Sequence, residues 1–141
     1  MRAPNGGVRN ALGMVMLGGG ALMLVYWTLY LTGIVDLGQS DPVVASFESA
    51  FLLADTLLGV LLLAAGWSLL AGRRSGPYLM TVAAAMSVYL GLLDLAFYAR
   101  LGMLSSLSAA SLFELSLVST CVVGGSICLA YGWKLFTSVV R

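Results

Sequence analysis

The longest uncharged stretch of the sequence runs from Asn10 to Val35 and contains 26 residues. A helix needs about 20 residues to cross the hydrocarbon core of a bilayer, so this stretch alone is long enough. Three further apolar stretches follow, separated by short polar turns. Apolar residues make up 60% of the 141-residue chain and charged residues only 9%, which leaves too few polar side chains to cover a water-soluble globule. The sequence therefore predicts an all-α integral membrane protein.

The turns between these stretches predict the order of the helices. We expect one transmembrane domain, residues 1–141, with helices at about residues 11–34, 42–70, 77–98 and 112–137. Pro42 and Pro77 suit the start of a helix, where the missing N–H costs nothing, and Gly102 suits a C-terminal cap. Short connections make successive helices antiparallel neighbours, so an up-down-up-down bundle of four transmembrane helices is predicted.

The basic residues predict the orientation. One side of the bundle is expected to carry Arg2, Arg9, Arg73, Arg74, Lys134 and Arg141, and the opposite side only Arg100. Cytoplasmic ends carry the excess of Lys and Arg, so both termini are predicted to be cytoplasmic, in the plasma (inner) membrane. The first apolar stretch is longer than a signal-peptide core, and we expect it to be retained.

Composition excludes several classes of site. The chain has no histidine, which rules out Ser-His-Asp and Cys-His catalysis, His-ligated zinc and axial-His haem. Seven basic and six acidic residues nearly cancel, so neither a basic face for nucleic acid nor a polybasic cluster for anionic lipid is expected. No phosphate-binding loop, metal motif or lipidation signal is present, and we expect no cofactor, no bound metal and no catalytic residue.

Three polar side chains are predicted to share one depth. Counting 1.5 Å per residue from the cytoplasmic helix ends places Trp27, Asp55 and Asp94 about 25 Å up, in the outer half of the bundle. Glu48 lies on the same helix face as Asp55, seven residues away, and Asp94 lies on the same face as Tyr98. A carboxylate turned to lipid costs several kcal/mol, so these acids are expected to face the interior.

These positions predict a ligand-binding pocket in the outer half. Its predicted residues are Asp55, Asp94, Glu48, Trp27, Tyr30 and Tyr98. Two facing acids would share a proton, which suits a proton relay, a cation site or a hydrogen-bonded pair that fixes helix packing. Two simpler interpretations stay open: Glu48 as a solvated residue in an early helical turn, and the aromatic residues as an interfacial belt.

Small residues predict the helix contacts. The triplet Gly18-Gly19-Gly20 is costly in an isolated helix but permits a neighbouring membrane helix to approach closely. On the fourth helix Gly124, Cys128 and Gly132 recur every four residues as a packing ridge, against either the first helix or another subunit. Cys121 and Cys128 are about 10 Å apart on one helix, too far for a disulfide within a monomer.

We expect a small non-enzymatic membrane protein with an outward-opening acidic and aromatic pocket that binds or passes a small cation, a proton or an amphipathic ligand. The expected partners are membrane lipids and a second copy or a larger membrane complex. One alternative is an accessory or assembly subunit of such a complex, with the small-residue faces as interfaces. A second alternative is a lipid-modifying membrane enzyme in which Asp55 and Asp94 act as acid and base.

Overall fold

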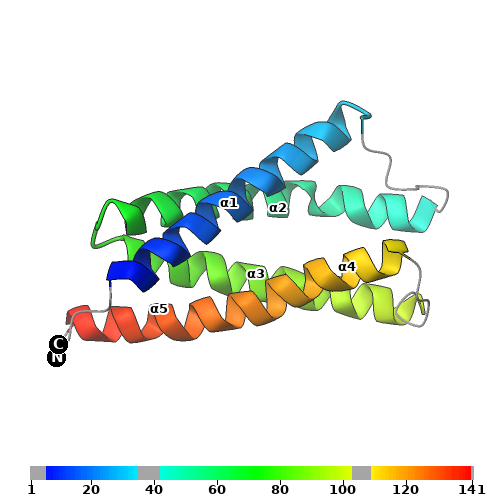
Figure 1. Cartoon of the computed structure of the whole chain (residues 1–141). Coiled ribbons are helices and arrows are strands. Elements are labelled where there is room, and N and C mark those ends of the chain that lie inside the picture. Colours follow the sequence, from blue (N-terminus) through cyan, green and yellow to red (C-terminus); the bar gives the residue numbers. More distant parts are fainter. Residues whose placement is uncertain (1–5, 35–41, 103–108, 141) are drawn as a thin grey trace. The chain divides into compact units, whose positions relative to one another are not determined.

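The computed structural model describes residues 6–34, 42–102 and 109–140, and every regular element within these ranges is a helix (Figure 1). The elements are, in chain order, α1 (Gly6–Leu31), α2 (Pro42–Leu70), α3 (Gly76–Arg100), α4 (Ala109–Ser119), the π-helical turn η2 (Thr120–Gly124) and α5 (Gly125–Val140). Since α4, η2 and α5 follow one another without a break, they form one long helical segment. The predicted all-helical fold is confirmed for this part of the chain.

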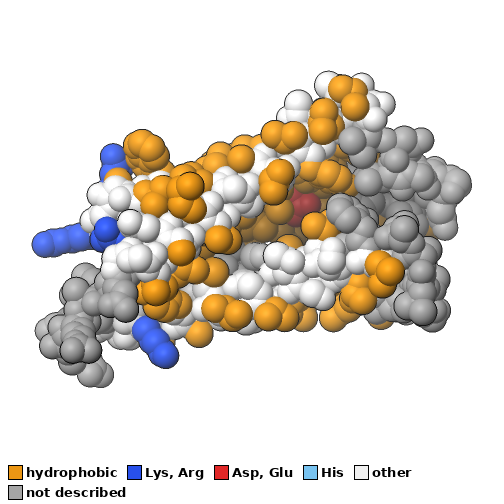
Figure 2. Space-filling view, in the orientation of Figure 1, with side chains coloured by type: hydrophobic (Ala, Val, Ile, Leu, Met, Phe, Trp, Pro, Cys, Tyr) orange, Lys and Arg blue, Asp and Glu red, His pale blue; other side chains and the backbone are white. Residues whose placement is uncertain are grey.

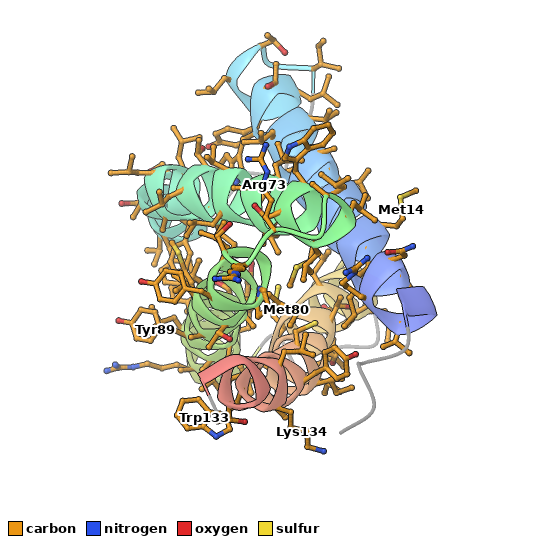
Figure 3. All side chains as sticks on the ribbon, turned by 90° about the vertical axis from the view of Figure 1, so that its left-hand side faces the viewer. Met14, Arg73, Met80, Tyr89, Trp133 and Lys134 are labelled. Atoms are coloured by element: carbon orange, nitrogen blue, oxygen red, sulfur yellow. The ribbon has the colours of Figure 1, made fainter. Side chains whose placement is uncertain are left out.

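Four helical segments are long and apolar enough to cross a membrane, as predicted. They are Gly6–Leu31, Ser49–Leu70, Gly76–Arg100 and Leu115–Leu135. Large hydrophobic side chains lie on their surfaces, with Leu22 72% and Leu53 80% exposed, and Figure 2 shows many such side chains on the face in view. Tyr89 on α3 and Trp133 on α5 also point outward (Figure 3). Surfaces of this kind suit contact with lipid, so length and composition make this a membrane protein.

The helix ends lie near the predicted turns, but three of the four ranges differ. The third helix, α3, spans Gly76–Arg100 instead of residues 77–98, and α4, η2 and α5 together span 109–140 instead of 112–137. Whereas α2 has the predicted bounds, α1 spans Gly6–Leu31 instead of residues 11–34. It ends early because Gly33 takes a φ of 72°, a left-handed conformation that stops a helix. The predicted cap at Gly102 is confirmed, since its φ is 70° and its N–H donates to the carbonyl of Ala99.

The chain divides into two compact units, Met1–Leu79 and Met80–Arg141. In the first unit α1 and α2 are antiparallel, and α1 crosses α2 (Figure 1). In the second unit α3 runs antiparallel to the segment formed by α4, η2 and α5. Buried apolar residues include Met16, Trp27, Leu58, Ala65 and Leu69 in the first unit, and Met80, Ala83, Ala84, Leu90 and Val118 in the second. The single domain and the up-down-up-down order stay predictions.

Candidate functional site

The backbones of α1 and α2 touch at two pairs of glycines in the first unit. A Cβ atom added to Gly20 would lie 2.7 Å from the carbonyl oxygen of Gly59, and one added to Gly66 would lie 2.7 Å from that of Gly13. Side chains do not fit at such distances, so glycine is required for this approach. Because Gly13 and Gly20 are seven residues apart, as are Gly59 and Gly66, each helix uses one face for the contact.

The glycine triplet of α1 contributes only one of its members to this contact. Gly20 packs against α2 as predicted, whereas a Cβ on Gly18 or Gly19 would meet no described atom within 4 Å. The face of α2 that carries Asp55, Gly59 and Gly66 is the face turned toward α1. Helix packing therefore selects one rotational setting of each helix.

At one end of the contact face a hydrogen bond joins the two helices. Trp27 lies seven residues after Gly20, and Asp55 lies four residues before Gly59, so both follow the contact face. The indole Nε1–H of Trp27 donates to Oδ2 of Asp55 over 3.2 Å. Trp27 is only 4% exposed, and Asp55 is half-buried. Trp27 and Asp55 therefore lie at one level of the α1–α2 pair, and their depth in a membrane stays a prediction.

Two tyrosines pack edge-on against the indole of Trp27. The ring centroids of Trp27 and Tyr26 are 5.4 Å apart with the planes at 79°, and those of Trp27 and Tyr30 are 5.2 Å apart at 82°. Edge-to-face aromatic pairs contribute about 0.5–1.5 kcal/mol each beyond their buried area. These contacts restrain the indole, so the donor that faces Asp55 is held in place by α1 itself.

Asp55 is the one charged residue in the apolar segment Ser49–Leu70. A carboxylate in hydrocarbon is costly unless it is hydrogen-bonded, paired or protonated. An ionised carboxylate offers about four acceptor positions, and the indole N–H uses one. The ring faces of Trp27 and Tyr30 are electron-rich and attract cations. This arrangement has the chemistry to hold a proton or a small cation at Asp55.

The other predicted site residues lie on α2 and α3. Glu48 is in the second turn of α2, and its side chain lies outside the described part of the structure. Asp94 and Tyr98 are four residues apart on one face of α3, with Asp94 half-buried and Tyr98 only 4% exposed. Both belong to the second unit, and their place in one pocket with Asp55 stays a prediction.

In the second unit α3 packs closely against the π-helical turn η2. A Cβ on Gly91 would lie 2.8 Å from Cβ of Cys121, and one on Gly125 would lie 2.8 Å from Cγ2 of Val88. The hydroxyl of Ser87 donates to the carbonyl of Cys121 over 3.3 Å. The sequence does not predict this turn, because the i→i+5 bonds of a π-helix are rare and no local residue pattern specifies them.

The predicted packing ridge of the fourth helix is only partly covered. A Cβ on Gly124 would meet no described atom within 4 Å, while Cys128 is half-buried and Gly132 is buried. Gly125 makes the close contact with α3 instead. A π-helical turn holds more residues than an α-helical turn, so it rotates the residues that follow away from a strict spacing of four. Contact of Gly124 with another subunit stays a prediction.

Within residues 6–34, 42–102 and 109–140, the His, Cys, Asp and Glu side chains form no group of three that could hold a metal ion. The hydrogen bond from Trp27 joins α1 to α2 at Asp55, whose carboxylate can also bind a proton or a small cation. No family model, no curated protein and no solved structure matches this chain.

Proposed function

We propose that this chain is an integral membrane protein that binds a proton or a small cation at Asp55, with Trp27 as the hydrogen-bond partner of the carboxylate. The observation that carries the proposal is the 3.2 Å hydrogen bond from the indole to the carboxylate inside the α1–α2 pair. An acid within a membrane-spanning segment is costly, and the usual reason for one is a proton or ion site. The aromatic rings beside Asp55 would equally suit the cationic end of an amphipathic ligand.

In the proposed topology the four helices run up-down-up-down and both termini are cytoplasmic. Support comes from the first unit, where Arg9 near the start of α1 lies beside Gly72, just after the end of α2. Arg73 and Arg74 follow Gly72, so all three arginines lie at one end, and basic residues favour the cytoplasmic side. Asp55 is about 25 Å from Gly72 along α2, so in this topology the proposed site belongs to the outer half of the plasma (inner) membrane.

The complete proposed pocket also includes Glu48, Tyr30, Asp94 and Tyr98. The edge-on contact between Tyr30 and Trp27 supports the inclusion of Tyr30 in this pocket. A second acid near Asp55 would let two carboxylates share one proton, as in a proton relay. Because four helices are few for a transporter, passage of an ion across the membrane would require a second copy of the chain.

Thermal unfolding of the purified protein in detergent tests the proposal, from pH 4 to 9 and with or without Na⁺, K⁺ and Mg²⁺. A ligand that binds only the folded state stabilises it, by about 2.7 kcal/mol at a concentration of 100 Kd. We expect a cation to raise the melting temperature of the wild type, more so at high pH, where fewer protons compete for Asp55. Asp55→Asn should remove both the cation effect and its dependence on pH.

Two further variants define the site. Trp27→Phe removes the indole donor but keeps the carboxylate, so the cation effect should weaken and persist. Asp94→Asn should reduce the effect as well, since the proposed pocket contains both acids. A wild-type melting temperature that ignores pH and cations, or an equal cation response in Asp55→Asn, refutes a binding site at Asp55.

The second candidate is an accessory subunit of a larger membrane complex. Favouring it are three glycines, Gly18, Gly19 and Gly124, at which an added Cβ would meet nothing within 4 Å in the described ranges. Small residues on a helix surface suit close packing with another membrane helix. Purification from native membrane separates the candidates: an accessory subunit should bring its partner in fixed stoichiometry, and a self-contained binding protein should not.

A further inference from the structure

Three arginines lie at one end of the first unit. Arg9 is in the first turn of α1, and Arg73 and Arg74 are in the turn between α2 and α3. The Nη1 atom of Arg9 is 3.6 Å from the position of a Cβ on Gly72, so its guanidinium lies against the start of this turn. Lys and Arg side chains project beside the α2–α3 turn in Figure 2. The near-zero net charge predicts no basic cluster, but the α1–α2 hairpin brings together arginines from segments more than 60 residues apart.

The segments that form this end contain no acid to neutralise the arginines. Residues 1–35 and 56–93 have neither Asp nor Glu. Asp55 is about 25 Å away along α2, well beyond ion-pair distance. A positively charged surface without a carboxylate partner in its own segments favours an external anion.

The side chain of Arg9 also has an unused hydrogen-bond donor. Its Nε–H is buried and has no hydrogen-bond partner among the described residues. A buried donor of a charged group is costly when it stays unpaired, so this position calls for an acceptor. The planar guanidinium presents Nε–H and Nη–H in a fork that matches two oxygens of one phosphate group.

We propose that Arg9, Arg73 and Arg74 form a binding site for the phosphate group of an anionic ligand. The membrane-spanning segment of α1 begins at this end and that of α2 ends here, and phospholipid headgroups lie at such span ends. An anionic phospholipid and a soluble phosphate ester both supply the required group. The site is independent of the proposed function at Asp55, because it lies about 25 Å from Asp55 along α2.

Thermal unfolding of the full chain in mixed micelles tests this site. The lipid probes are phosphatidylglycerol and phosphatidylcholine, and the soluble probes are glycerol 3-phosphate and inorganic phosphate. We expect phosphatidylglycerol to raise the melting temperature at concentrations at which phosphatidylcholine does not. A lipid-headgroup site responds to phosphatidylglycerol alone, and a site for soluble esters also responds to the soluble probes. Equal effects of the two lipids, without any effect of the soluble probes, would overturn the proposal.

Variants separate a built phosphate site from general charge attraction. Arg9→Lys keeps the charge but removes the Nε–H and the planar fork, and the double variant Arg73→Gln/Arg74→Gln changes only the exposed turn. We expect the apparent affinity for the effective probe to fall about fivefold for each arginine changed to glutamine, which corresponds to ~1 kcal/mol per basic side chain near an anionic surface. Arg9→Lys keeps this charge, so its expected loss of affinity comes from the hydrogen bonds of the guanidinium alone. Lys134→Gln on α5 is the matched control and should bind as the wild type does. Full affinity in Arg9→Lys, or an equal loss in Lys134→Gln, would overturn the site.

Discussion

Alanine at Gly20 should force α1 and α2 apart, whereas alanine at the adjacent Gly19 should not. The added Cβ of Gly20→Ala would lie 2.7 Å from the carbonyl oxygen of Gly59 and 3.0 Å from Cγ of Leu63. The oxygen belongs to the backbone of α2 and cannot rotate away, so the helices would have to separate by about 0.7 Å to reach ordinary contact. A Cβ at position 19 would meet no described atom within 4 Å.

The two variants should change the free energy of unfolding in opposite directions. Overpacking costs about 1–3 kcal/mol, and the higher helix propensity of alanine returns roughly 0.5–1 kcal/mol. Gly20→Ala should therefore lower the free energy of unfolding by about 1–2 kcal/mol, while Gly19→Ala should raise it by roughly 0.5–1 kcal/mol. The two variants should differ by about 1–3 kcal/mol, the overpacking cost alone, although they place the same methyl group on adjacent residues of one helix.

Equilibrium unfolding in detergent, titrated with sodium dodecyl sulfate and followed by tryptophan fluorescence, measures this difference. Trp27 lies on the contact face, so Gly20→Ala should also change its emission under native conditions. Gly66→Ala is an independent repeat, because its Cβ would lie 2.7 Å from the carbonyl oxygen of Gly13. Equal stability of the variants at positions 19 and 20 would refute the close approach of α1 and α2.

Three further predictions concern the hydrogen bonds and the second unit. In a double-mutant cycle of Trp27→Phe and Asp55→Leu, each single variant removes the hydrogen bond between the indole and the carboxylate, and we expect a coupling free energy of about 0.5–1.5 kcal/mol; additive effects of the two changes would contradict the hydrogen bond. Gly91→Ala should cost about 1–3 kcal/mol in the same unfolding assay, because its Cβ would lie 2.8 Å from Cβ of Cys121 in η2. Gly124→Ala should be neutral or stabilising, and a larger loss of stability in Gly124→Ala than in Gly91→Ala would contradict the packing at η2. Ser87→Ala should speed amide hydrogen exchange in η2, and unchanged exchange would show that the turn does not depend on this hydroxyl.

The fold was predictable where each helix can be treated separately. Long apolar runs predict the spans, and a fixed rise per residue predicts that Trp27 and Asp55 share a depth. Local sequence does not show which member of Gly18-Gly19-Gly20 meets α2, since the three residues are identical. The seven-residue spacing of Gly13, Gly20 and Trp27 is the sequence signal that identifies the contact face of α1.

No such signal in the sequence indicates that Gly125, and not Gly124, packs against α3. A strict spacing of four predicts one ridge through Gly124, but the π-helical turn rotates the next residue toward α3. The turn packs against Gly91 and accepts a hydrogen bond from the hydroxyl of Ser87, and both residues are 30 or more positions away in the chain. Sequence reasoning that assumes regular helix geometry therefore misplaces this contact.

The sequence by itself determined the membrane class and the four apolar helices, because length and hydropathy act on each helix alone. Tertiary structure alone decided that Gly20 meets Gly59, that Trp27 donates to Asp55, and that Arg9 lies beside the α2–α3 turn. The physical reason is that lipid is as apolar as a leucine-rich helix face. Hydropathy therefore cannot distinguish the face that meets another helix from the face that meets lipid, and that choice is made by close packing and a few hydrogen bonds.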